Sequence, residues 1–147
     1  MTMLSALLLV AACGGGAASG NRLFGSAETQ YDLVFDAVQI HRQESRGQMV
    51  AMIVTYLRGP GTNKQAIPVK VVANAPVAEG QEKDLMKEGA LTRVMQDASQ
   101  FSEMKSGKVI FDTLGGAGSA AKGRFYVTFV KGSTLNGEFS GTVELLQ

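Results

Sequence analysis

The chain has 147 residues, and its 14 Lys and Arg against 13 Asp and Glu leave a formal net charge of +1. Charges of both signs are interspersed, so the sequence lacks the basic stripe that attracts a nucleic-acid backbone, and we exclude nucleic-acid binding. With a single cysteine, an internal disulfide is excluded as well. A chain of this length suits one domain that buries its own core.

The first informative feature is an apolar run that ends at the only cysteine. Residues 4–12 (LSALLLVAA) carry no charge, and Cys13 follows directly. The run is about half of the roughly 20 residues that cross a bilayer, so it can engage a secretion machinery without forming a stable span. The small side chains of Ala11 and Ala12 suit the narrow cleft of a signal peptidase. The alternative is that residues 4–12 form the first buried helix or strand of a cytosolic domain.

This segment resembles the processing site of bacterial lipoproteins. In that family the signal peptide is cut before the cysteine, whose thiol receives a diacylglyceryl group and whose new amine receives a third acyl chain. The resemblance implies a signal peptide over residues 1–12, lipidation of Cys13 and attachment to the membrane through the lipid. Gly14 stands where some inner-membrane lipoproteins have a retaining aspartate, so the resemblance favours the outer membrane of the cell envelope.

The residues after Cys13 predict a tether. Residues 14–20 (GGGAASG) have no side chain large enough to pack into a core. A flexible coil of about seven residues has an r.m.s. reach of roughly 15 Å, enough to hold a folded domain clear of the lipid headgroups. We therefore expect residues 13–24 to form the lipidated tether and residues 25–147 to form a β-domain.

The first half of this domain predicts strands. Segments rich in β-branched, aromatic and aliphatic residues are separated by glycine-containing turns at 45–47 and 59–61. The predicted strands are 31–42, 49–58 and 66–73. In the last of these, Pro68 confines the strand to a sheet edge or marks its beginning.

The strand predicted over 31–42 changes parity along its length. Leu33 and Phe35 share one face, whereas Val38 and Ile40 have the opposite parity. A side-chain period of two cannot absorb that change, so we predict a bulge near Ala37 or a strand covered on both faces.

The segment 81–104 leaves two alternatives open. Its apolar residues follow helical spacing, which favours a short helix, but Gly89 and Thr92 disfavour one. We expect at least one strand within 90–99. The next segment, 108–114, predicts a strand clearly.

The carboxy-terminal hairpin has a parity that restricts its register. The apolar residues of both strands occupy odd positions, so residues that pair on one face require a connecting loop with an odd number of residues. We predict a loop at 131–133, which leaves a phenyl ring free to cover the bare backbone of Gly137. The predicted pairs are Phe129 with Leu135, Val127 with Gly137 and Phe125 with Phe139.

Together these elements predict a mainly β fold. The expected architecture is a single antiparallel β-sandwich of about seven or eight strands, with a short helix within 81–104 as the open alternative.

Motifs for chemistry are weak. Residues 116–121 (GAGSAA) match the G-x-G-x-x-A pattern of dinucleotide sites, but a strand follows where that chemistry needs a helix N-terminus. We interpret the segment as a connection between strands, and Lys122 lacks the spacing of a phosphate-binding lysine. His41 is the only histidine, so with Cys13 assigned to lipid we predict no catalytic triad, no metal site and no cofactor. His41 is interpreted as a strand-end residue.

The remaining polar and soft side chains have structural interpretations. Asp32 and Asp36 are expected on the polar face of a strand, and the carboxylates from Glu79 to Glu88 in a solvated connection. The methionines are interpreted as core filler because they lack the close spacing of a copper site. The residues concerned are Glu79, Glu82, Asp84 and Glu88, and Met49, Met52, Met86, Met95 and Met104.

The leading hypothesis for function is therefore a lipid-anchored envelope protein that is not an enzyme. It would be a binding or structural module that meets a protein, glycan or other envelope component through its strand-connecting loops. One alternative is a β-barrel carrier of a small apolar ligand, which requires a large interior cavity. Another is a hydrolase, which requires two carboxylates in one cleft within about 10 Å.

Overall fold

A computed structural model describes residues 20–59 and 66–146 of the chain. The predicted signal peptide, Cys13 and most of the predicted tether lie outside the described residues, as does most of the turn predicted at 59–61. Among the described residues, no helix has the length and apolar character needed to cross a membrane.

The described residues form nine strands and two short helical segments. This mainly β fold confirms the predicted class, and segment 81–104 contains both a short helix and the expected strand. The elements are β1 (Arg22–Phe24), η1 (Ser26–Thr29), β2 (Ala37–Ser45), β3 (Gln48–Arg58), β4 (Ala66–Asn74), β5 (Glu82–Asp84), α1 (Leu85–Glu88), β6 (Gly89–Val94), β7 (Met104–Leu114), β8 (Ala120–Phe129) and β9 (Thr134–Leu146).

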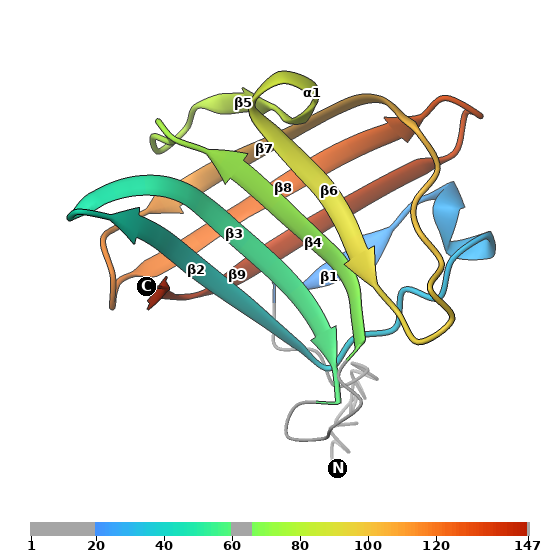
Figure 1. Ribbon diagram of the computed structural model, residues 1–147, viewed down its shortest axis with the longest axis horizontal. Helices are drawn as coiled ribbons and strands as arrows, with labels where there is room; N and C mark the ends of the chain where they lie inside the picture. The colour runs from blue at the N-terminus through green and yellow to red at the C-terminus, as the bar shows by residue number, and fades with distance from the viewer. Residues whose placement is uncertain (1–19, 60–65, 147) are drawn as a thin grey trace, which may run out of the picture.

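The strands form one strongly curved sheet that nearly closes into a barrel. Their order is β5-β7-β8-β9-β2-β3-β4-β6, and β1 pairs with β9 off this path. Every pairing is antiparallel except that of β2 with β9, which is parallel. Figure 1 shows the two halves facing each other as layers, with β2, β3, β4 and β6 in front of β7, β8 and β9. The layers of the predicted sandwich are thus joined through β9.

Strand β9 belongs to both layers. Its residues 134–142 pair with β8, whereas residues 143–146 pair with β2. Tyr56 of β3 is fully buried and crosses the core to β9, where its hydroxyl donates a hydrogen bond of 2.7 Å to the carbonyl oxygen of Glu138. Burial and the nearby charge of Glu138 hold the pKa of the Tyr56 hydroxyl far above its ordinary value.

The register predicted for the β8–β9 hairpin is wrong by two residues. The last pair is Thr128 with Thr134, so five residues, 129–133, lie between the paired ends instead of the predicted five-residue span 130–134 around 131–133. The number is odd as predicted, whereas none of the three predicted pairs forms. The physical reason is a pair of close contacts between rings and bare backbone. A Cβ atom on Gly137 would overlap the ring of Phe125, and one on Gly123 would overlap the ring of Phe139. The observed pairs are Phe125 with Gly137, Gly123 with Phe139 and Val127 with Leu135.

The strand predicted over 31–42 is wrong in its first half, because β2 begins only at Ala37. There is no bulge near Ala37, since the irregularity between β2 and β3 lies at Gln43 and Glu44. Asp32 accepts a hydrogen bond of 3.2 Å from the backbone N–H of Val34, and this local bond competes with strand pairing. The apolar residues change parity between Phe35 and Val38 because the chain passes there from a connection into strand β2.

Two predicted features of the front layer are confirmed. The turn at 45–47 joins β2 to β3, with Arg46 and Gly47 at positive φ of 53° and 76°, which is typical of a type I′ hairpin turn. Pro68 lies near the beginning of β4, where the pairing with β6 is interrupted between Ile67 and Lys70.

The core between the layers is filled by side chains from both. Aromatic rings pack edge to face within it, with centroid distances of 5.2 Å for Phe111 and Phe139 of one layer and 6.0 Å for Tyr56 and Phe125 from opposite layers. Strand β3 is covered on both faces, because every residue from 51 to 57 is buried.

We predict that Gly137→Ala destabilises the fold. The new methyl group must displace the ring of Phe125 inside a filled core, at a cost of about 1–3 kcal/mol in the free energy of unfolding. The matched control is Gly116→Ala, since no atom lies within 4 Å of a Cβ at that position. Urea unfolding measures both variants, and equal midpoints would contradict the observed register.

Candidate functional site

The aspartates predicted on the polar face of a strand lie instead in the connection before β2, so that prediction is wrong. Asp32 accepts a hydrogen bond of 2.9 Å from Arg58, and Asp36 accepts one of 2.8 Å from the backbone N–H of Gly59. Both carboxylates fasten this connection to the end of β3. The hydrogen bonds from Arg58 and from the Val34 N–H lower the pKa of Asp32 below its ordinary value of 3.8.

Asp32 and Asp97 line one hollow of about 360 Å³, one of several described hollows with two carboxylates in the wall. Arg58, Met95 and Gln96 are also part of its wall. Hydrogen bonds from Ser99 lower the pKa of Asp97 too, so both carboxyl groups are held ionised. A general acid for hydrolysis needs a raised pKa, and this hollow therefore does not favour the hydrolase alternative.

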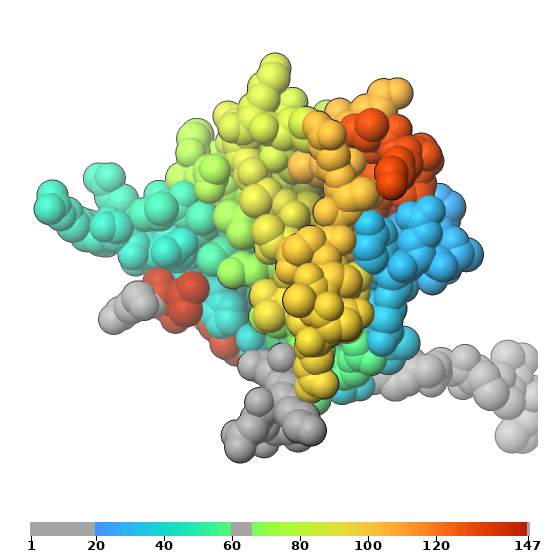
Figure 2. All heavy atoms as spheres, turned by 45° about the vertical axis from the view of Figure 1, so that its right-hand side comes forward, coloured from blue at the N-terminus to red at the C-terminus, as the bar shows by residue number. Residues whose placement is uncertain are grey.

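A buried arginine supports this end of the barrel. Arg93 is only 2% exposed and donates a hydrogen bond of 2.9 Å to the backbone carbonyl oxygen of Asp32. Its guanidinium carbon lies 5.0 Å and 5.2 Å from the ring centroids of Tyr31 and Phe101. Figure 2 shows the segment between β6 and β7 lying against the N-terminal part of the described chain, where these rings meet. Desolvation lowers the pKa of Arg93.

A second buried cation lies in β5, just before α1. Lys83 is 1% exposed, and its Nζ lies 2.7 Å from the carbonyl oxygen of Pro76 and 3.3 Å from Oε2 of Glu88. Glu88 thus holds α1 to β5 rather than standing alone in a solvated connection. The sequence carried no signal for either buried cation, because nothing in the pattern distinguished Lys83 or Arg93 from surface charges.

The remaining candidate residues have structural positions. His41 lies in the middle of β2 instead of at a strand end, with its Nε2 3.4 Å from Oε2 of Glu144 on β9. The 116–121 segment leads directly into β8, which begins at Ala120. Backbone hydrogen bonds join Gly118 and Ser119 to Val143 of β9, as expected for a connection. Groups of three or more His, Cys, Asp or Glu that could hold a metal do not occur within residues 20–59 and 66–146.

The methionines divide between the core and the surface. Met52 is fully buried, and Met49 and Met104 pack against the core, in agreement with their interpretation as filler. Met86 on α1 is 51% exposed, so the prediction is wrong for this residue. It lies instead beside the outer surface of β7.

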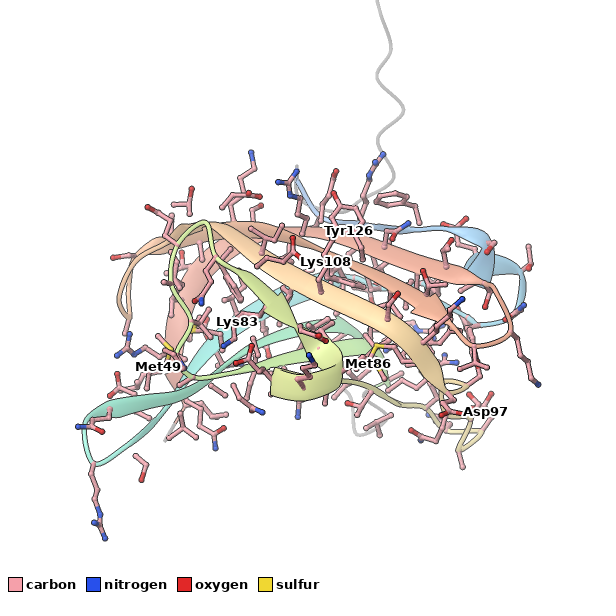
Figure 3. The ribbon with its side chains drawn as sticks, turned by 90° about the horizontal axis from the view of Figure 1, so that it is seen from above. Met49, Lys83, Met86, Asp97, Lys108 and Tyr126 are labelled. Atoms are coloured by element: carbon pink, nitrogen blue, oxygen red, sulfur yellow. The ribbon has the colours of Figure 1, made fainter. Side chains whose placement is uncertain are left out.

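That surface is the strongest candidate binding site of the described chain. Alternation along β8 turns Arg124, Tyr126 and Thr128 outward, and pairing aligns them with β7 and β5. Two adjoining hollows of about 480 and 420 Å³ lie on it and share Glu82, Lys108 and Tyr126. We call this surface the outer β7–β8 face; its side chains are Glu82, Asp84, Met86, Lys105, Ser106, Lys108, Ile110, Arg124, Tyr126 and Thr128. Figure 3 shows Lys108 and Tyr126 on the outer side of the sheet, with Lys83 between the layers.

The centre of the face is an exposed tyrosine beside an ion pair. Tyr126 is 37% exposed, and Lys108 Nζ lies 5.8 Å from its ring centroid and 3.3 Å from Oε2 of Glu82. Within the part of the chain that the structure describes, the hydroxyls of Ser106, Tyr126 and Thr128 have no hydrogen-bond partner. These groups are available to a ligand.

Sequence reasoning missed this face because no motif marks it. The only signal was the alternation of polar residues along β8, which also describes an ordinary solvated face. Comparisons with protein-family models, curated proteins and solved structures found no match, so the assignment of function rests on this geometry.

We predict that Arg58→Ala raises the pKa of Asp32 toward 3.8, because it removes the strongest interaction that favours the carboxylate. As the folded pKa lies below the unfolded one, this carboxylate stabilises the fold at neutral pH, and the contribution disappears as the pH falls from about 4 through the folded pKa. Carbon-13 NMR of the carboxyl groups measures the shift. Arg124→Ala is the control, since its partner is Asp112, and an unchanged Asp32 titration in Arg58→Ala contradicts the assignment.

Proposed function

We propose that this chain is a lipid-anchored protein of the bacterial cell envelope whose β-domain is a non-enzymatic binding module. The outer β7–β8 face is its contact surface. The observation that carries the proposal is this hollowed face, whose exposed tyrosine and unpartnered hydroxyls stand over a filled core. The strand-connecting loops were predicted to meet the partner, whereas the proposed contact surface is the face of a sheet.

The anchor is supported by the apolar run before Cys13 and by its resemblance to lipoprotein processing sites. The described chain begins at Gly20, next to β9, where the backbone N–H of Ser140 donates a hydrogen bond of 2.7 Å to Oδ1 of Asn21. In the sequence, residues 14–20 link the proposed lipid on Cys13 to the β-domain. We propose that the lipid is inserted in the outer membrane.

The packing supports surface binding over the carrier alternative. A carrier needs an enclosed apolar cavity of several hundred Å³. In the described part of the chain, the phenyl rings of Phe111, Phe125, Phe129 and Phe139 are at most 1% exposed and occupy the space between the layers. The two hollows of the outer β7–β8 face open to solvent, and their walls are outward-facing side chains.

We predict that Cys13→Ser abolishes lipidation. The exported wild-type protein should lack residues 1–12, carry the mass of the acyl chains and partition into detergent, because several acyl chains together make attachment effectively permanent. The variant should lose the acyl mass and the detergent partitioning. Intact mass spectrometry and phase partitioning measure both, and identical behaviour of the two proteins would disprove the anchor.

We predict that a photo-reactive residue at Ser106 cross-links to an envelope component in living cells, and that adding Tyr126→Ala reduces the yield. The matched control is the same residue at Thr92, which is exposed on the outer face of β6 in the opposite layer. Gel shifts measure the products. Equal yields at the two positions would show that the outer β7–β8 face is not the contact surface.

A further inference from the structure

The charges of the outer β7–β8 face nearly cancel. Glu82 and Asp84 oppose Lys105, Lys108 and Arg124. Lys108 pairs with Glu82 at 3.3 Å, and Arg124 pairs with Asp112 at 3.5 Å. A strongly charged polymer or an anionic lipid surface is attracted by an excess of one sign, which this face does not present. The charge of the face therefore matches an uncharged ligand.

The polar groups of the face suit a ligand with many hydroxyl groups. The unpartnered hydroxyls of Ser106, Tyr126 and Thr128 can each donate and accept, as can every hydroxyl of a sugar. The Glu82 carboxylate and the Lys108 ammonium are exposed enough to take further hydrogen bonds, and bonds to charged groups are the stronger ones.

Tyr126 gives the face an apolar contact of the right shape. A pyranose ring has faces made of C–H groups, which pack on an aromatic ring through dispersion and weak C–H interactions. Met86 and Ile110 lie beside the tyrosine in the adjoining hollows and extend this contact. These apolar side chains are separated by charged ones, whereas a protein partner is met by a continuous apolar centre.

The shape of the site suits a chain-like ligand. The hollows adjoin along β7 and β8, so a ligand lying along these strands meets two cross-strand rows of side chains in turn. Each hollow has the size of an ordinary ligand site. The rows are Glu82, Ile110 and Arg124, and Asp84, Lys108 and Tyr126.

From these observations we infer that the outer β7–β8 face binds an uncharged saccharide chain, with Tyr126 stacked on one sugar ring. The inference rests on the proposed function only in taking this face as the contact surface. It does not depend on lipidation of Cys13.

Calorimetry with the full-length processed protein tests the inference, in a detergent that has no sugar headgroup. The probes are the uncharged hexasaccharides of maltose, cellulose, mannan and chitin type. At least one should bind, and its affinity should be insensitive to salt. Tyr126→Ala should weaken binding about tenfold, and Tyr126→Phe, which keeps the ring, about threefold or less. Thr92→Ala and Lys70→Ala on the opposite layer should leave affinity unchanged.

Other results would overturn the inference. These are the absence of binding to every uncharged probe, binding to anionic polysaccharides alone with strong salt dependence, or equal losses in Tyr126→Ala and Thr92→Ala. Urea unfolding of each variant verifies that the fold is intact. If Ser106 still cross-links in cells while no saccharide binds, the inference fails and the proposed contact surface stands. If a saccharide binds while Cys13 carries no lipid, the anchor fails and the inference stands.

Discussion

The register of β9 is the constraint on which the rest of the structure depends. This strand pairs with β8 in its first part and with β2 in its last, so a slip on either side would move both layers. Three interactions act on the same alignment: the Phe125 ring covers Gly137, the Phe139 ring covers Gly123, and the Tyr56 hydroxyl bonds to β9. The two ring contacts fit this pairing because a Cβ atom at Gly137 or Gly123 would overlap the ring that lies against it.

The alternation along β8 and its pairing with β7 produce the outer face. Since side chains alternate along β8, fixing Phe125 and Val127 in the core also fixes Arg124 and Tyr126 outside, opposite residues of β7. The same strand thus supplies one face to the core and the other face to the proposed contact surface. A slip of two residues between β7 and β8 would keep the inside apolar, but it would set Tyr126 opposite a residue other than Lys108.

The dependence on long-range pairing explains which features of the fold and of the candidate site could be predicted from the sequence. Parity limits a hairpin to an odd loop but cannot distinguish registers two residues apart. The contacts of Phe125 with Gly137 and of Phe139 with Gly123 select one of them. The alternation at Leu33 and Phe35 is typical of a strand, but it cannot reveal that the Asp32 carboxylate accepts a hydrogen bond from the Val34 N–H. That local bond competes with strand pairing in this connection. The candidate face was beyond sequence reasoning because it depends on a long-range pairing that sets Glu82 beside Lys108.

The hollow beside α1 exists because β5 stops early. It pairs with β7 only at Lys108–Ile110, and beyond that point α1 takes the place of a continuing strand. Leu85 of α1 is buried against Gly107, where a side chain would collide with Met104, so the helix approaches β7 closely and leaves Met86 at the rim. A longer β5 would pair the edge of β7 and fill the hollow. The early end of β5 therefore shapes the surface that we propose for binding.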